Sequence, residues 1–180
     1  VVRLGSGSGE PWGPDLVGLF VGSEGMFGIA TEITARRAPI PASVRTMLAD
    51  FGSVRHASEA VSAIIAAGLV PAALEMMDRG CVAAVEASIY AAGYPTDAAA
   101  VLLVEMDGAE PAVVAEALAV EALLREHGAR GVRSATTPLE RARLWQGRKK
   151  AFGAMGRIAP DLAVQDAVVP RSALPAILDR

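Results

Sequence analysis

The chain has 180 residues, 52% of them hydrophobic, and a formal net charge of −3. This length can bury a real core in one or two domains. The acidic balance excludes a nucleic-acid surface, which needs a stripe of basic residues. Apolar runs stay under about ten residues, whereas a membrane-spanning helix needs about 20, so we expect no membrane span.

The cysteine and histidine residues limit which disulfides and metal sites the chain can form. The single cysteine, Cys81, cannot form an internal disulfide, which fits a reducing compartment and predicts a cytoplasmic location. His56 and His127 lie far apart, and neither belongs to a group with metal-ligand spacing, so we expect no metal site.

The first 40 residues have the composition of strands joined by glycine-rich loops. Strand character at 1–4 is followed by a loop at 5–15. Two apolar runs, 16–21 and 27–30, predict a strand, a turn and a second strand, which the alternation at 31–35 extends.

Three glycines, Gly22, Gly25 and Gly28, occupy the turn between those apolar runs. Glycine adopts positive φ readily and lets a ligand approach the main chain closely. Backbone N–H groups in such a turn can bind an anion, typically phosphate. The turn is therefore either purely structural or a site for a phosphate-bearing ligand, and it matches neither a Walker loop nor G-x-G-x-x-G.

Pro39 and Pro41 break the chain and predict a domain boundary, with 1–40 before it and 41–180 after it. Beyond the prolines, strands and helices alternate. This alternation fits either an α+β domain with helices on one face of an antiparallel sheet or a doubly wound α/β domain. The predicted strands are 46–51, 71–76, 99–106, 130–135 and 163–169; the predicted helices run from Ser53 to Gly68, over 78–92, from Pro111 to Gly128, over 137–158 behind a capping box, and from about 174.

Arg148 lies in the middle of an apolar stripe on the predicted helix 137–158. An unpaired buried charge is costly. One interpretation is an internal ion pair with Glu75, Glu105 or Asp166, or a side chain that reaches the rim. The other is a guanidinium that faces a cleft and binds a substrate carboxylate through two parallel hydrogen bonds.

Other polar residues carry weaker indications. The neighbouring cations Arg141, Arg143, Lys149 and Lys150 predict a solvated helix face. Asp166 interrupts an apolar run, and without a basic or acidic neighbour it does not indicate acid–base chemistry. A formal G-x-S-x-G at 5–9 lacks the strand-to-helix elbow of a hydrolase.

Several motifs in order resemble one family. The segment 15–32 resembles the last FAD-contacting segment of FAD-linked oxidases that have a PCMH-type, vanillyl-alcohol-oxidase-like flavin domain. Residues 74–79, 92–95, 144–152 and 165–171 are similar to the cap domain of glycolate oxidase GlcD-type subunits in that family. Together these segments extend the resemblance over essentially the whole chain.

The resemblance implies an FAD-dependent oxidoreductase that oxidises a small 2-hydroxy acid, such as glycolate or D-lactate, by hydride transfer to the flavin. It also implies an α+β fold: residues 1–40 end an FAD-binding domain, and residues 41–180 form an incomplete ferredoxin-like cap with an antiparallel sheet and helices on one face. Arg148 matches the arginine of a Trp-x-x-Arg motif that binds the substrate carboxylate. The implied FAD contacts are Gly22, Ser23, Gly25, Gly28 and Ile29.

The same resemblance places the chain in the middle of a longer subunit. A Pro-Gly-Gly-type pyrophosphate loop is expected before Val1, and a His-x-Gly-Asp-Gly-Asn segment after Arg180. We therefore expect these 180 residues alone to be inactive, and further oxidase subunits to be possible partners. The alternative is a non-catalytic α+β ligand-binding or assembly module, in which the glycine turn is structural and Arg148 forms an internal ion pair.

Overall fold

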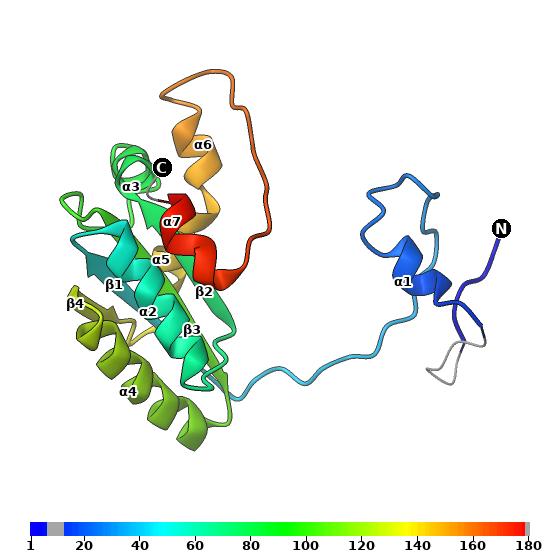
Figure 1. Cartoon of the computed structure of the whole chain (residues 1–180), viewed down its shortest axis with the longest axis horizontal. Coiled ribbons are helices and arrows are strands. Elements are labelled where there is room, and N and C mark those ends of the chain that lie inside the picture. Colours follow the sequence, from blue (N-terminus) through cyan, green and yellow to red (C-terminus); the bar gives the residue numbers. More distant parts are fainter. Residues whose placement is uncertain (7–12, 179–180) are drawn as a thin grey trace. The chain divides into compact units, whose positions relative to one another are not determined.

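The structure, a computed structural model, describes residues 1–6 and 13–178. The chain forms two compact units, Val1–Pro39 and Ile40–Arg180 (Figure 1). None of the described helices is both long and apolar enough to cross a membrane.

The first unit contains the helix α1, Leu16–Phe20, where the sequence predicted a strand. The Asp15 carboxylate caps this helix by accepting a hydrogen bond from the backbone N–H of Gly18 at 2.8 Å. The described residues of this unit contain no strand, so the strands predicted at 1–4, 27–30 and 31–35 are also wrong. A strand requires a second backbone to pair with, whereas the capped helix satisfies its own hydrogen bonds locally.

The second unit is built on a four-stranded antiparallel sheet with the order β2-β3-β1-β4. The central strands β1 and β3 pair along their whole length, from Ser43 opposite Gly108 to Phe51 opposite Ala100. This antiparallel pairing excludes the doubly wound alternative and confirms the α+β class. The strands are β1 (Ser43–Phe51), β2 (Ala73–Asp78), β3 (Ala100–Gly108) and β4 (Ala129–Ser134).

Two helices, α2 (Val54–Ala66) and α4 (Glu110–Glu126), cover one face of the sheet and connect its strands in the ferredoxin-like order. Figure 1 shows them running alongside each other. Ser53 caps α2, as predicted, by accepting a hydrogen bond from the N–H of His56 at 3.1 Å. The main core lies between these helices and the sheet.

The opposite face is also covered, by α3 (Arg79–Glu86), α5 (Pro138–Lys149) and α6 (Ala151–Met155). The expectation of helices on one face only is therefore wrong. Neighbouring residues on β3 point to opposite faces, and Leu102 and Leu103 are both 0% exposed. The continuous apolar run of β3 is the sequence signal for this double burial.

The predicted helix 137–158 is divided in two at Lys150, which has φ −103° and ψ 8°. The helix predicted over 78–92 ends earlier, at Glu86. No strand forms over 163–169, because this segment pairs with no other backbone. The chain instead loops to a 3₁₀ turn, η1 (Arg171–Ala173), and to α7 (Leu174–Leu178), which lies against α2 (Figure 1).

Candidate functional site

Helix α5 carries the candidate site and begins with the predicted capping box. The backbone N–H of Glu140 donates to the Thr137 hydroxyl at 3.2 Å, and the Glu140 carboxylate accepts from the N–H of Thr137 at 3.0 Å. The same carboxylate accepts from the N–H and hydroxyl of Thr136, which, together with the cap, holds the pKa of Glu140 below its usual value. The start of α5 is therefore fixed at Pro138.

A buried carboxylate on the sheet anchors this helix. Glu105 on β3 is only 9% exposed and accepts four hydrogen bonds. The Arg141 guanidinium donates to both of its oxygens, from Nε at 2.8 Å and from Nη2 at 2.7 Å. The Trp145 indole N–H donates at 2.7 Å and the Thr46 hydroxyl at 2.5 Å. Strands β1 and β3 and helix α5 therefore meet at one carboxylate.

These contacts decide the charge state of Glu105. Burial favours the neutral acid and by itself would raise the pKa. The hydrogen bonds from Arg141, Thr46 and Trp145 outweigh burial, so the pKa lies below its usual value of 4.5. Arg141 is exposed, as predicted for a solvated face, but its guanidinium also binds this carboxylate, which the prediction did not include. Arg143, Lys149 and Lys150 are exposed.

Arg148, one α5 turn beyond Trp145, forms the ion pair that the sequence allowed as one interpretation. Its Nε donates to the Glu75 carboxylate at 2.9 Å, and the two side chains are 33% and 37% exposed. Of the three partners considered, Glu105 is engaged by Arg141, and Asp166 lies on an exposed loop. The pair is therefore partly exposed to solvent at the edge of the core.

A hollow of about 520 Å³ opens next to the anchored helix. Glu105 contributes one carboxylate to the wall, and three cationic residues from α5 and its C-terminal cap also line it. Most of the residues in the wall are polar or charged, and the excess of cations favours an anion. Its lining includes Glu105, Arg141, Trp145, Gln146, Lys149 and Lys150.

The loop at 92–95 is locked against α5. The Tyr94 hydroxyl donates to the Leu144 carbonyl, and the Glu86 carboxylate accepts from the backbone N–H groups of Ala92 and Tyr94, both at 2.9 Å. Burial raises the pKa of Tyr94 to about 12. A Cβ on Gly147 would lie 2.6 Å from the Tyr94 ring, so only glycine allows this approach. Two of the segments that carry the family resemblance therefore contact each other.

The five predicted FAD-contacting residues lie in one turn of the first unit. Gly22, Gly25 and Gly28 have φ of 80°, 83° and 148°, a region that favours glycine. No atom lies within 4 Å of the position that a Cβ would take at Gly22 or Gly25. Ser23 is half-buried and Ile29 is exposed.

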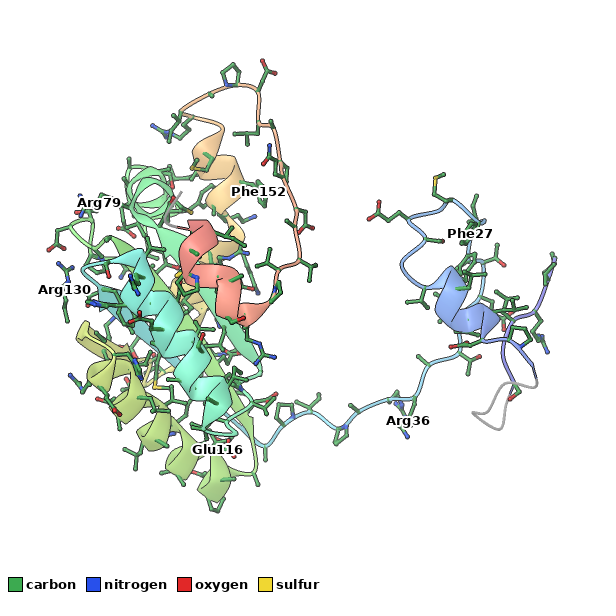
Figure 2. The ribbon with its side chains drawn as sticks, viewed as in Figure 1. Phe27, Arg36, Arg79, Glu116, Arg130 and Phe152 are labelled. Carbon is green, nitrogen blue, oxygen red and sulfur yellow. The ribbon has the colours of Figure 1, made fainter. Side chains whose placement is uncertain are left out.

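This turn fits a flavin dinucleotide on two counts. Its left-handed glycines leave the main chain open to a diphosphate, and exposed apolar side chains stand beside it, including Phe27 at 64% exposure (Figure 2). An adenine or flavin ring can pack against such side chains. Arg148 belongs to the second unit.

Comparison with known proteins decides the family. Residues 40–180 match the family described as FAD linked oxidases, C-terminal domain. The chain belongs to this family. The FAD-linked oxidase assignment thus confirms the resemblance found in the sequence and is consistent with the α+β fold.

Similar curated proteins include the glycolate oxidase subunit GlcD of Escherichia coli (strain K12), which is 48% identical over 178 residues, covering 99% of this chain and 36% of that protein. The Bacillus subtilis GlcD is 40% identical, with 89% and 34% covered. The mitochondrial D-lactate dehydrogenase (cytochrome) of Arabidopsis thaliana is 29% identical, with 93% and 30% covered. The chain thus spans about a third of the length of these relatives.

A solved structure shares the fold. An alkyldihydroxyacetonephosphate synthase superposes with a TM-score of 0.69 at 18% identity, covering 93% of this chain and 35% of that one. At this identity the likeness supports the fold and carries no statement about substrate.

Sequence reasoning missed the Glu105 cluster as a unit. A signal was present: Arg141, Trp145 and Arg148 recur at i, i+4 and i+7, which places them on one helix face. Glu105 was visible as the interruption of the apolar β3 run. The match between helix face and carboxylate depends on how β1 and β3 pair, which no local pattern encodes.

We expect Glu105→Gln to lower the free energy of unfolding by about 2 kcal/mol at neutral pH, because hydrogen bonds to a charged group are strong and the amide presents a donor to surrounding donors. Urea denaturation measures this loss. The matched control is Glu121→Gln, which removes an exposed ion pair with Arg125 and should cost only about 0.3–0.5 kcal/mol.

The pH dependence has a defined sign. Since the folded pKa of Glu105 is lowered, its contribution is fully present above its usual value of 4.5 and is lost as the pH falls through the folded pKa. The difference between wild type and Glu105→Gln should therefore shrink in acid. Equal losses of unfolding free energy in Glu105→Gln and Glu121→Gln would contradict this account of the cluster. So would a difference in stability between wild type and Glu105→Gln that does not shrink in acid.

Proposed function

We propose that this chain is part of an FAD-dependent oxidoreductase that oxidises a small 2-hydroxy acid of the glycolate or D-lactate type. The observation that carries the proposal is the guanidinium of Arg148, which Glu75 holds by a single hydrogen bond from Nε and which remains 33% exposed. The support from relatives is that similar chains are named glycolate oxidase subunit and D-lactate dehydrogenase.

The two units have separate roles in this proposal. Residues 1–40 form the last part of the FAD-binding domain, whose turn from Gly22 to Ile29 holds the diphosphate side of FAD with its main chain. Residues 41–180 form the substrate cap. When bound, FAD supplies the hydride acceptor, a chemistry that belongs to the cofactor.

The protein's own contribution at the cap is to bind and orient the substrate. A guanidinium matches a carboxylate with two parallel hydrogen bonds, which fixes the substrate's rotation as well as its position. Fixing the carboxylate also fixes the adjacent carbinol carbon, from which hydride leaves. The cations of the hollow, Lys149 and Lys150, raise the local concentration of an anionic substrate.

The proposal extends to the setting of the protein. The relatives' names contain the word subunit, which supports assembly with other oxidase subunits. A reducing compartment such as the cytoplasm suits a chain whose one cysteine, Cys81, is free.

In the complete protein that contains this chain, we expect Arg148→Ala to raise the KM for glycolate or D-lactate about 100-fold, since a charge-assisted pair of hydrogen bonds contributes on the order of 3 kcal/mol. Arg148→Lys should give an intermediate KM, because it keeps the charge and loses the planar fork. Steady-state kinetics measures both. Arg125→Ala, which breaks an exposed ion pair on α4, is the control. An unchanged KM would favour the alternative of a non-catalytic module.

A second prediction concerns the glycine turn. We expect Gly25→Val in the complete protein to lower the flavin absorbance per mole of protein, because a branched side chain both strains a φ of 83° and blocks the main chain. Gly68→Val is a matched control: Gly68 has a φ of 78° and equally open surroundings, but lies in the second unit. If both variants lose a similar amount of melting temperature but only Gly25→Val loses flavin, the proposal is supported. Equal flavin content in the two variants would contradict it.

A further inference from the structure

We propose that Glu75 is a positioning residue for substrate binding: it holds the Arg148 guanidinium by its Nε edge, so that the two Nη groups face an incoming carboxylate. This inference rests on the proposed function and deepens it, because it assigns a role to a residue that does not itself touch the substrate.

The location of Glu75 suits this role. It lies on β2, an edge strand of the sheet, and pairs in register with Leu103 of β3. Leu103 is fully buried, as is Met77 two residues along β2 on the same face. The carboxylate therefore has apolar neighbours on the sheet side and a partly open side toward the last turn of α5, where Arg148 lies.

The hydrogen bond between the two residues leaves a complete binding edge. A guanidinium has five N–H donors arranged around a planar fork. Glu75 accepts from Nε, at 2.9 Å. The end of the fork, formed by Nη1 and Nη2, has the geometry for a second carboxylate with two parallel hydrogen bonds. One arginine can thus be held by a protein carboxylate on one edge and bind a substrate carboxylate on the other.

The second carboxylate on the same face shows the contrast. Glu105 has both oxygens bound by Arg141, accepts two further hydrogen bonds, and its side chain is 11% exposed. Both oxygens of Glu105 are thus taken up by protein donors, and this pair anchors the helix. The Glu75–Arg148 pair has one hydrogen bond, and the Glu75 side chain is 37% exposed. Glu105 therefore fixes α5, and Glu75 fixes the orientation of one side chain on it.

Two effects of Glu75 on an anionic substrate oppose each other, which makes the inference testable. As a positioning group, it lowers the cost of ordering a long, flexible arginine and so strengthens binding. As a negative charge, it repels the substrate carboxylate and so weakens binding. We propose that positioning outweighs repulsion, which fixes the direction in which substitutions should change affinity.

The experiment uses Glu75→Ala and Glu75→Gln in the complete, FAD-loaded protein. The readouts are KM and kcat for glycolate and D-lactate, and the calorimetric Kd of oxalate, a carboxylate without a carbinol hydrogen. We expect Glu75→Ala to raise KM and the oxalate Kd about 10-fold, the effect of one lost hydrogen bond, with kcat nearly unchanged. Glu75→Gln should restore most of the affinity, because its amide oxygen still accepts from Nε.

A double-mutant cycle separates positioning from stability. In an Arg148→Ala background, Glu75→Ala should change neither KM nor Kd further, because there is no guanidinium left to orient. Glu121→Ala is the matched control for loss of a Glu–Arg pair and should leave binding unchanged. If Glu75→Ala folds poorly, the near-isosteric Glu75→Gln by itself tests whether removing the negative charge strengthens or preserves oxalate binding.

The contrary results are distinct. Tighter oxalate binding in both Glu75 variants would show that repulsion dominates and would overturn the inference. Lower stability with unchanged Kd would also overturn it and would leave the pair a structural contact. If Arg148→Ala itself changes neither KM nor Kd, the proposed function fails together with the inference; if Arg148→Ala weakens binding and Glu75→Ala does not, only the inference fails.

Discussion

The position of α5 on the sheet depends on the pairing of carboxylates on the sheet with arginines on this helix. Glu105 and Glu75 lie on the same sheet face, on neighbouring strands, and bind Arg141 and Arg148. A buried or half-buried carboxylate must be compensated, and the i, i+7 spacing of Arg141 and Arg148 places both arginines on one helix face. The Glu105–Arg141 pair therefore fixes the position of α5 on the sheet, and the Glu75–Arg148 pair fixes the orientation of Arg148 on that helix.

Most of the second unit could be predicted from the sequence, because its elements follow local rules. The amphipathic period of α2, its Ser53 cap and the capping box of α5 are all local patterns, and each is present in the structure. The first unit could not be predicted in the same way. Its apolar runs have the composition of strands, but strand formation depends on a partner backbone, and the Asp15 cap makes a helix of residues 16–20 instead.

The candidate site was predicted only in part, for a comparable reason. The apolar stripe indicated that Arg148 needs either a carboxylate partner or a ligand, and the family resemblance pointed to the same residue. Strand register decides that Arg148 binds Glu75 and not Glu105. Glu75 lies opposite Leu103, whereas Glu105 lies opposite Thr46 and its carboxylate is already bound by Arg141. Contacts that join residues 36 to 73 positions apart are set by topology, which local sequence patterns do not contain.

The central claim is that Arg148 binds the substrate carboxylate while Glu75 keeps hold of its other edge. An experimental structure of the complete, FAD-loaded protein with oxalate bound tests this most directly. The account predicts the Nη atoms of Arg148 within about 3.2 Å of an oxalate carboxylate, with Nε still donating to Glu75. Oxalate bound to other side chains, with Arg148 contacting only Glu75, would contradict it.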